Sequence, residues 1–481
     1  MEHLYEKLTA YSKTDAYPYH MPGHKRRLCG NIPSVITDMD ITEIDGFDNL
    51  HQPEEIIKEL QEKTAALYSA DRSYFLVNGS TCGILSAISA AVPQGGHLLM
   101  ARNCHKSAYH AVYLRGLQVT YLYPPMFSDF SFFDGITPQQ VEQALQRQPG
   151  IKAVFIVSPT YEGRIADVAA IAEIVHAKGI PLIVDEAHGA HLGLAEGFAD
   201  NSNQAGADIV IHSVHKTLPA LTQTAILHCN GNRINKEKLE RYLHIYQTSS
   251  PSYLLMASID NALQIVEKSG KELFLQFRDN YKQMLDRLSA CINLRFVTEV
   301  SHKQDIGKLV IDCSATEMSG KQLYDILRER YHLQLEMACE SYCLAMFTIG
   351  DDIQAYERMT KALLEIDGEI HPSGVCLQAA KNKEKNDLEC NLCEQAGTKG
   401  ISLPLCRAWD MSWEEISLQQ AVGRVVAEFV NLYPPGVPLL VPGEQFTEEM
   451  YRKLVSFLQQ GLNVQGICRK DDQYALKCVL L

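Results

Sequence analysis

Residues 74–92 read YFLVNGSTCGILSAISAAV, which is a short apolar run, a turn and a stretch of small residues. The run at 74–77 predicts a strand, Asn78-Gly79 is a typical turn pair, and the small residues that follow predict a helix to Val92. The same alternation extends in both directions along the chain. Further strands are expected at 98–101, 119–123, 153–157, 182–184 and 209–211, with helices at 53–68, from 105, from 137 and at 168–178. Apolar strands that alternate with helices predict an α/β fold whose mostly parallel sheet is covered by helices on both faces.

The pattern changes after residue 227. Long helices are expected over 236–288, followed by a smaller α+β unit with strands at 308–312 and 344–349 and helices at 320–330 and 353–364. The stretch 379–399 is polar and charged, which indicates a linker. We therefore predict an N-terminal arm (1–50), a large domain (51–290), a small α+β domain (291–370), a charged linker (371–400) and a C-terminal domain (401–481).

Composition narrows the class of protein. The 481 residues are 46% hydrophobic, and 44 Lys+Arg against 58 Asp+Glu give a net charge of −14, so we expect no nucleic-acid partner. The amino terminus has no uninterrupted apolar run, and no stretch is long enough to span a bilayer, so we expect neither a secretory signal nor a membrane partner. The fourteen cysteines are scattered without a framework spacing, which predicts reduced thiols and a cytoplasmic protein. Cys390 and Cys393 form one CxxC pair, but no second pair of ligands follows at short spacing, so we expect no metal.

The first candidate site follows the strand at 74–77. Ligands of open parallel sheets bind beyond the carboxyl ends of the strands. Ser80, Thr81 and Cys82 open the helix there, and backbone N–H groups and hydroxyls at a helix start can hold a phosphate. Taken alone, the same residues are also ordinary helix caps.

Two later strand ends carry an acid and a lysine. Asp185-Glu186-Ala187-His188 follows the strand at 182–184 and reads like a helicase DEAH box, but the chain has no GxxxxGK[ST] loop to hold a nucleotide. Asp185 is then either a capping acid or a carboxylate partner for a cationic ligand atom. Lys216 follows the strand at 209–211 in Ser213-Val214-His215-Lys216, where burial would lower its pKa and make it a nucleophile. A surface lysine is the alternative.

The order of these features points to pyridoxal 5'-phosphate (PLP). This cofactor needs a phosphate site, an acid that keeps its pyridine nitrogen protonated, and a lysine for its aldehyde. Ser158, after the strand at 153–157, could offer a hydroxyl to the phenolic oxygen of the ring. His105 opens a helix, where its imidazole could stack on the pyridine face.

At these residues the sequence resembles the bacterial ornithine/lysine/arginine decarboxylase family, which is a fold-type-I PLP group of the aspartate aminotransferase-like superfamily. The matching strings run in the family's order over nearly the whole chain. They are HMPGHK (20–25), NGSTCG (78–83), RNCHKS (102–107), VDEAHG (184–189), SVHK (213–216) and YPPGVP (433–438) ending in PGE (442–444).

The resemblance implies roles for these residues. Lys216 would be the Schiff-base lysine, Asp185 the partner of the pyridine nitrogen, and His105 the stacking residue. Phosphate contacts would come from Ser80, Thr81, Ser213 and His215, whereas Cys82 stands where we would expect a small or hydroxyl residue, which leaves its contact open. The chain looks like the shorter biosynthetic-type members without an N-terminal wing domain, and the superfamily implies at least a homodimer with sites at the subunit interface.

The implied reaction is decarboxylation of a basic amino acid (arginine, lysine or ornithine) to carbon dioxide and agmatine or a diamine, in polyamine metabolism. His188 is our candidate for a substrate contact or for the proton donor, with Lys216 as its competitor. Glu444, and more weakly Asp45 or Asp48, could line an acidic pocket for the substrate side chain. The alternatives are an aminotransferase or aldolase on the same fold, and a non-catalytic regulatory paralogue.

Overall fold

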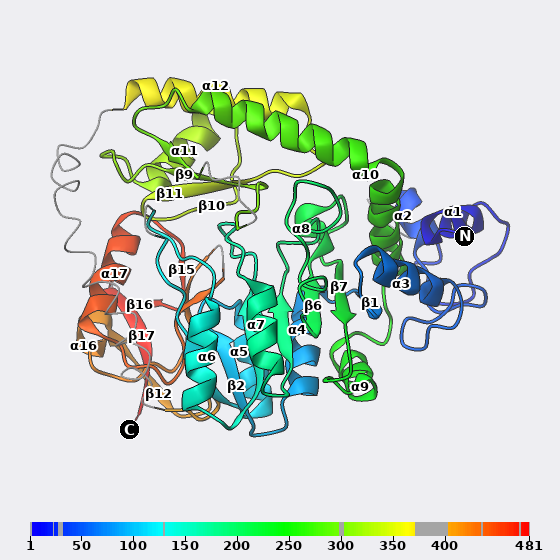
Figure 1. Cartoon of the computed structure of the whole chain (residues 1–481), viewed down its shortest axis with the longest axis horizontal. Coiled ribbons are helices and arrows are strands. Elements are labelled where there is room, and N and C mark those ends of the chain that lie inside the picture. The colour runs from blue at the N-terminus through cyan, green and yellow to red at the C-terminus, as the bar shows by residue number, and fades with distance from the viewer. Residues whose placement is uncertain are drawn as a thin grey trace. The chain divides into compact units, whose positions relative to one another are not determined.

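The computed structural model describes residues 2–22, 24–26, 32–127, 130–297, 303–370, 403–433, 436–470 and 473–480 (Figure 1). The chain divides into two compact units. Unit 1 comprises Met1–Pro93, Lys152–Ser158 and Val168–Gln276, and unit 2 comprises Gln94–Ile151, Pro159–Asp167 and Phe277–Leu481. The units cut across the domain borders expected at residues 50 and 290, and those borders stay predictions.

The strands of unit 1 lie in the order β1 (Arg72–Leu76), β7 (Ala225–Cys229), β6 (Ile209–His212), β5 (Leu182–Asp185) and β4 (Ile151–Val157). β4, β5 and β6 are parallel, as their apolar sequences predict, and every residue of β5 and β6 is buried. β7 is antiparallel to both of its neighbours, and the sequence pattern had not marked it as a separate strand. The carboxyl ends of β5 and β6 therefore meet at one edge.

Helices join these strands. Those of unit 1 are α1 (Leu4–Ser12), α2 (Ser34–Met39), α3 (Ile56–Leu67), α4 (Gly79–Ala91), α7 (Val168–His176), α8 (Val214–Thr217) and α9 (Lys236–Tyr246), and α10 (Tyr253–Leu288) continues into unit 2. α4 contains small residues because its backbone lies against the sheet. A Cβ added at Gly83 would lie 2.7 Å from Cδ1 of Leu76 and 3.3 Å from Cγ2 of Ile211. This close contact fixes the start of α4 beside the strand ends.

The start of the N-terminal arm is hydrogen-bonded to α10. The Asp260 carboxylate accepts the backbone N–H of Leu4 at 2.8 Å and lies 2.9 Å from Nδ1 of His3. Leu4 and Leu8 are completely buried. Burying two leucine side chains stabilises the attachment by about 1.5–3 kcal/mol each.

Unit 2 begins with the parallel strands β2 (His97–Ala101) and β3 (Gln118–Leu122), joined by α5 (Lys106–Arg115). α6 (Pro138–Arg147) follows, and Thr137 and Gln140 form a capping box at its start. A second sheet has the order β10 (Met337–Ala338), β11 (Tyr342–Met346), β9 (Lys308–Asp312) and β8 (Arg295–Phe296). Along the chain, α11 (Gly320–Tyr331) comes between β9 and β10, and α12 (Ile353–Glu369) follows β11. The strand expected at 344–349 begins two residues earlier, because Tyr342 pairs with Asp312.

The C-terminal part of unit 2 has two small sheets around its own apolar core (orange to red in Figure 1). They are β12 (Trp413–Ser417), β17 (Gln473–Val479) and β16 (Cys468–Lys470), and β14 (Pro438–Leu440), β13 (Val430–Leu432) and β15 (Val464–Gln465), with helices α15 (Leu405–Ala408), α16 (Leu418–Ala421) and α17 (Glu448–Gln459). The expected linker at 371–400, including Cys390 and Cys393, lies outside the described residues.

Candidate active site

Lys216 sits on α8, directly beyond the end of β6. Its Nζ lies 3.1 Å from Nε2 of His188, which follows β5. An ammonium group has only donors, so Nε2 accepts and the proton of the neutral imidazole is assigned to Nδ1. His188 is buried. The structure thus brings together the predicted lysine and the predicted substrate-side histidine.

Asp185 ends β5 at the same edge. It is 4% exposed, and its Oδ1 accepts the N–H of Ala187 at 3.2 Å. Burial raises the pKa of Asp185 to about 6, and the positive charge of Lys216 opposes this rise. A cationic group beside such a buried carboxylate favours its ionised form, and the protonated nitrogen of a pyridine ring would be such a group.

The start of α4 is where the sequence predicts a phosphate site. No side chain caps this helix among the residues that the structure describes, and Gly79 adopts φ +71° while its N–H donates to the carbonyl of Gln223 at 3.0 Å. The first-turn N–H groups at Ser80 and Thr81 carry the positive end of the helix dipole. Cys82 differs from them, because its thiol donates to the Gly79 carbonyl at 3.1 Å and burial raises its pKa to about 12.

Two buried hydroxyls near Lys216 provide a test of whether the site fits a phosphate. Ser213 Oγ and Thr217 Oγ1 make no hydrogen bond to any described residue, although Ser213 is 1% and Thr217 is 5% exposed. An unpaired buried hydroxyl costs about 1–3 kcal/mol. Such groups are expected where a ligand brings the missing acceptor, and phosphate oxygens fit this need.

His215 and Ser158 complete the predicted set in unit 1. The Nδ1–H of His215 donates to the carbonyl of Thr224 at 2.8 Å, and burial lowers the pKa of the imidazole. The ring is therefore neutral in this state, and a bound phosphate would have to draw a second proton to Nε2. Ser158 is buried beyond β4, and its N–H donates to the Asp185 carbonyl at 3.1 Å.

His105 lies in unit 2 as the N-cap of α5. Its Nδ1 accepts the N–H of Ser107 at 3.3 Å. The C-terminal chain covers the ring, since a Cβ added at Gly436 would lie 3.6 Å from Cδ2 and Nε2 of His105. The ring is thus held from two sides within unit 2, and its stacking role stays a prediction.

Glu444, expected to bind substrate, is already paired. Its Oε1 and Oε2 accept from Nε and Nη2 of Arg102 at 3.2 and 3.0 Å, and Oε2 also accepts the N–H of Val441 at 2.9 Å. Arg102 further donates to the carbonyls of Pro438 and Leu439. The negative charge of Glu444 is therefore neutralised by Arg102 within the protein rather than offered to a substrate.

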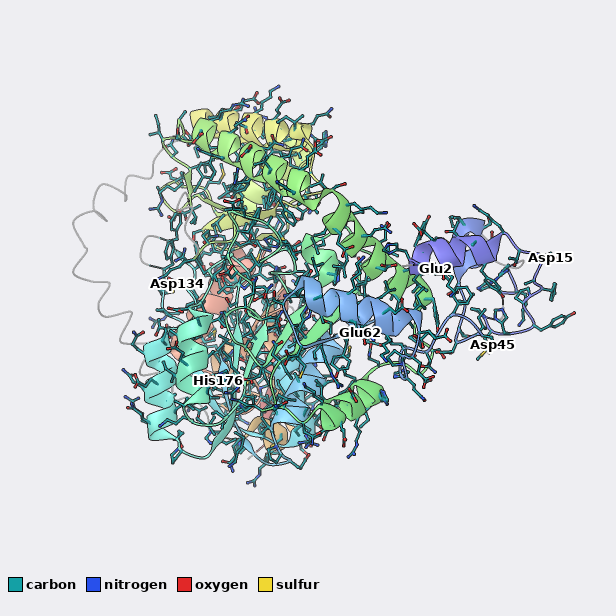
Figure 2. All side chains as sticks on the ribbon, turned by 45° about the vertical axis from the view of Figure 1, so that its right-hand side comes forward. Glu2, Asp15, Asp45, Glu62, Asp134 and His176 are labelled. Carbon is teal, nitrogen blue, oxygen red and sulfur yellow. The ribbon has the colours of Figure 1, made fainter. Side chains whose placement is uncertain are left out.

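The two weaker acidic candidates lie on the N-terminal arm. Asp45 is exposed there (Figure 2). Asp48 accepts the backbone N–H groups of Glu54, Glu55 and Ile57 at 2.9–3.0 Å ahead of α3. Burial alone would raise the pKa of Asp48, but these N–H groups outweigh it and the pKa is lowered. Asp48 thus serves the start of α3.

Among the described residues, no group of three His, Cys, Asp or Glu side chains could hold a metal ion. The helices in the described part of the chain also include none with the length and apolarity to cross a membrane.

Comparison with known proteins identifies the family. The Orn/Lys/Arg decarboxylase major domain matches residues 2–308, and the Orn/Lys/Arg decarboxylase C-terminal domain matches residues 407–467. The uncharacterized protein YaaO of Bacillus subtilis is 34% identical, with 98% of each chain covered. An arginine decarboxylase of Bacillus subtilis is 31% identical over 96% of this chain and 95% of its own. The inducible lysine decarboxylase of Escherichia coli is 23% identical over 84% of this chain and 67% of its own.

Solved structures confirm the predicted fold. The constitutive lysine decarboxylase of Escherichia coli superposes with a TM-score of 0.80 at 20% identity, covering 99% of this chain and 82% of that one. Lysine decarboxylase A of Pseudomonas aeruginosa gives 0.81 at 18% identity, covering 100% and 80%. With the matched domains and a lysine and a carboxylate at one sheet edge, the chain belongs to the Orn/Lys/Arg decarboxylase family and is a decarboxylase.

Proposed function

We propose that this chain binds PLP at Lys216 and decarboxylates a basic amino acid, with arginine as the expected substrate. The observation that carries the proposal is the grouping of Lys216, His188 and Asp185 at one edge of unit 1, beside buried hydroxyls that lack a partner among the described residues. When bound, PLP supplies an electron sink that accepts the electron pair of the bond to the departing carboxylate.

The phosphate end of the cofactor has a matching set of donors. The first-turn N–H groups of α4 at Ser80 and Thr81 would bind it, together with the hydroxyls of Ser213 and Thr217. Cys82 is left out of this set because its thiol faces the Gly79 carbonyl. His215 would join after taking up a proton at Nε2.

Asp185 would hold the proton on the pyridine nitrogen. Its carboxylate is buried, so an ion pair with that nitrogen is little screened by water. The same burial that raises the pKa of Asp185 makes a cationic partner favourable, because pairing removes the cost of an isolated buried charge.

Lys216 and His188 would handle the protons of the reaction. Lys216 would hold the cofactor through Nζ, and this atom, when it is not bound to the cofactor, could hold a proton next to Nε2 of His188. Either atom can then deliver the proton that replaces carbon dioxide on the α-carbon. The presence of both Lys216 and Asp185 is what argues against a non-catalytic paralogue.

The names of relatives support arginine. Two relatives that cover 96% and 98% of this chain, at 31% and 30% identity, are named arginine decarboxylases. The relatives named lysine decarboxylases are 23% and 25% identical. From the family resemblance we further propose a cytoplasmic enzyme of polyamine metabolism that acts as at least a homodimer.

The test is product analysis with purified, PLP-loaded protein. Arginine, lysine and ornithine are supplied separately, and carbon dioxide, agmatine, cadaverine and putrescine are measured, with keto acids as the sign of an aminotransferase. We expect agmatine and carbon dioxide in equal amounts from arginine. Keto acid formation, or no product from any of the three, would refute the proposal.

The lysine is tested without relying on turnover. Borohydride reduction of the loaded protein should fix the cofactor to the peptide that contains Lys216, which mass spectrometry detects. Lys216→Ala should lose both this label and the activity. A label on another lysine would move the site elsewhere.

A further inference from the structure

Glu186, next to Asp185, starts a buried polar network that the proposed reaction does not use. Glu186 is 1% exposed and His212, the last residue of β6, is fully buried. Nε2 of His212 lies 2.9 Å from Oε1 of Glu186. Oε2 of Glu186 accepts the N–H of Ser202 at 3.0 Å and also the Ser202 hydroxyl. All of these partners donate to the carboxylate.

The network continues from β6 across the neighbouring strands β7 and β1. Nδ1 of His212 lies 3.1 Å from Nε2 of His228 on β7, and Nδ1 of His228 lies 2.7 Å from the hydroxyl of Ser73 on β1. Burial, followed by the nearby His212, lowers the pKa of His228 well below its usual value, so this ring is neutral. One assignment of the protons satisfies every ring nitrogen. The Ser73 hydroxyl donates to Nδ1 of His228, Nε2–H of His228 donates to Nδ1 of His212, and Nε2–H of His212 donates to Glu186.

Tyr68 packs against both imidazoles. Its ring centroid lies 4.9 Å from that of His212 and 4.8 Å from that of His228, and its hydroxyl donates to the carbonyl of Ala190 at 2.7 Å. The network is thus enclosed by an aromatic ring whose own donor is satisfied elsewhere. Enclosed and fully satisfied networks of this kind hold one geometry, since any shift leaves a buried group unpaired.

The position of the Glu186–His212 bond relates it to the cofactor residues. Successive residues along a strand point to opposite faces, so Glu186 points away from the face of Asp185, and His212 away from that of Ser213. The N–H of Glu186 donates to the Ile211 carbonyl at 3.0 Å, which extends the ladder between β5 and β6 to this point. The side-chain bond therefore joins the carboxyl ends of the two strands that carry Asp185 and Lys216.

We propose that Glu186 and His212 are positioning residues that set the separation between Asp185 and Lys216, so that one PLP ring can meet both. The inference rests on the proposed function, because it concerns the same cofactor. Neither residue is among those proposed to hold the cofactor. Their effect comes through the strand ends, with Asp185 directly before Glu186 and Lys216 four residues after His212.

The same pair of strands offers a matched control at its other end. Oδ2 of Asp208, just before β6, accepts the N–H of Leu182 at 2.8 Å and lies 2.8 Å from Nε2 of His176. His176 ends α7 and is labelled in Figure 2. Asp208→Asn weakens the contacts of a buried carboxylate with His176 on α7 and with the N–H of Leu182 on β5. These contacts lie at the amino ends of β5 and β6, away from Asp185 and Lys216.

The experiment compares four variants: Glu186→Gln, His212→Leu, His212→Gln and Asp208→Asn. In Glu186→Gln, an amide NH₂ group faces partners that are all hydrogen-bond donors. His212→Leu removes the imidazole that donates to Glu186. In His212→Gln, the amide Nε2 of the new side chain can donate from about the position of the lost imidazole Nε2. The readouts are the dissociation constant of PLP, the visible circular dichroism of the bound cofactor and the melting temperature of the PLP-free protein.

We expect Glu186→Gln and His212→Leu to bind PLP about tenfold more weakly or worse, as seen when groups behind a metal ligand are removed, and to lose visible dichroism at saturation. His212→Gln should recover most of both. Asp208→Asn should melt at a lower temperature with affinity and dichroism unchanged. Wild-type affinity and dichroism in Glu186→Gln, or equal changes in Asp208→Asn, would overturn the inference.

Hydrogen exchange of the PLP-free proteins separates this inference from the proposed function. Exchange at residues 186–188 and 213–217 should rise in Glu186→Gln and stay low in Asp208→Asn. If the wild-type protein bound no PLP, the proposed function would fail, yet exchange would still show whether the bond holds the two strand ends. Unchanged exchange in Glu186→Gln would overturn the positioning role, and Glu186→Gln decides the matter should His212→Leu not fold.

Discussion

Nζ of Lys216 lies 3.1 Å from Nε2 of His188, although 28 positions separate the two residues in sequence. The contact joins the loop after β5 to the helix after β6, because these parallel strands end at the same edge. It gives the lysine a partner that can take a proton, and it gives the imidazole a fixed orientation.

We predict from this contact that His188→Ala lowers kcat by about 100-fold or more, because general acid–base groups contribute about 10²–10⁴. PLP binding should change little, since the cofactor is held mainly by other residues. Single-turnover assays with arginine measure the loss, and PLP titration measures the affinity. His191→Gln, a buried histidine on the same loop, is the control. Equal losses in both variants would contradict a specific role for His188.

Replacing the Asp185 carboxylate should have opposite effects on the stability of the PLP-free protein and on its activity. Its pKa in the folded, PLP-free protein is about 6, above the ordinary value of 3.8, so the folded state holds this proton more tightly than the unfolded chain does. Stability from the protonated form is fully present below pH 3.8 and is lost as the pH rises through about 6. At about 1.4 kcal/mol per pKa unit the ionised form costs about 3 kcal/mol.

Asp185→Asn should therefore raise the melting temperature of the PLP-free protein at pH 7–8, and the gain should vanish below about pH 4. Its decarboxylase activity should fall by about 10²-fold or more, as when a main electrostatic stabiliser is lost. Calorimetry across pH measures the first effect. If Asp185→Asn were less stable than the wild type at pH 8, the ionised Asp185 carboxylate would not destabilise the PLP-free protein.

The sequence predicted the local parts of this site well. Strands such as β5 and β6 are short apolar runs, so their ends, and the loops that carry Asp185 and Lys216, could be located from hydrophobic pattern alone. That both loops reach one edge followed from parallel pairing. The family match confirms the predicted decarboxylase class.

Partners distant in sequence could not be predicted in this way. Glu444 ends a motif and was assigned to substrate, yet its partner Arg102 lies 342 positions away, and no periodicity or spacing links them. Glu186 belongs to the DEAH string, and nothing in its sequence context indicates that it pairs with His212, 26 positions later. Which of several nearby charges a carboxylate meets depends on tertiary packing, and a single sequence gives no local signal of it.

The Arg102–Glu444 pair gives a third prediction. The two side chains are 11% and 13% exposed, and breaking a buried pair costs about 3–5 kcal/mol. Arg102→Met and Glu444→Leu should each destabilise unit 2, while the double variant should lose less than the two costs combined, with a coupling of about 2 kcal/mol. Urea titrations followed by tryptophan fluorescence suit this test, because the only tryptophans, Trp409 and Trp413, lie in the C-terminal part.

A further variant, Glu444→Gln, distinguishes a structural ion pair with Arg102 from the role in substrate binding that the sequence suggests for Glu444. If the carboxylate bound the substrate side chain, Glu444→Gln would raise KM for arginine and leave the urea midpoint unchanged. We expect the reverse, a lower midpoint and a KM near that of the wild type. Additive effects in the double variant would show that Arg102 and Glu444 do not stabilise each other.

The unpaired hydroxyl of Ser213 leads to the last prediction. Since this buried Oγ has no partner among the described residues, Ser213→Ala removes a polar group that only costs free energy in the PLP-free protein. The PLP-free variant should be as stable as the wild type or more stable by about 1 kcal/mol. Its affinity for PLP should fall by about tenfold, because a hydrogen bond to a charged phosphate contributes about 1.5–3 kcal/mol.

Ser86 is the matched control for Ser213. Its hydroxyl on α4 is also completely buried and unpaired among the described residues, but it lies beyond the first turn, where no phosphate contact is expected. Ser86→Ala should share the gain or constancy in stability and leave the PLP dissociation constant unchanged. Fluorescence titration of both PLP-free variants decides between them, and because the readout is binding, it does not depend on which amino acid is the substrate. If Ser213→Ala bound PLP as tightly as Ser86→Ala does, the hydroxyl would have no phosphate to meet, and the proposed donors would be reduced to the start of α4, Thr217 and protonated His215.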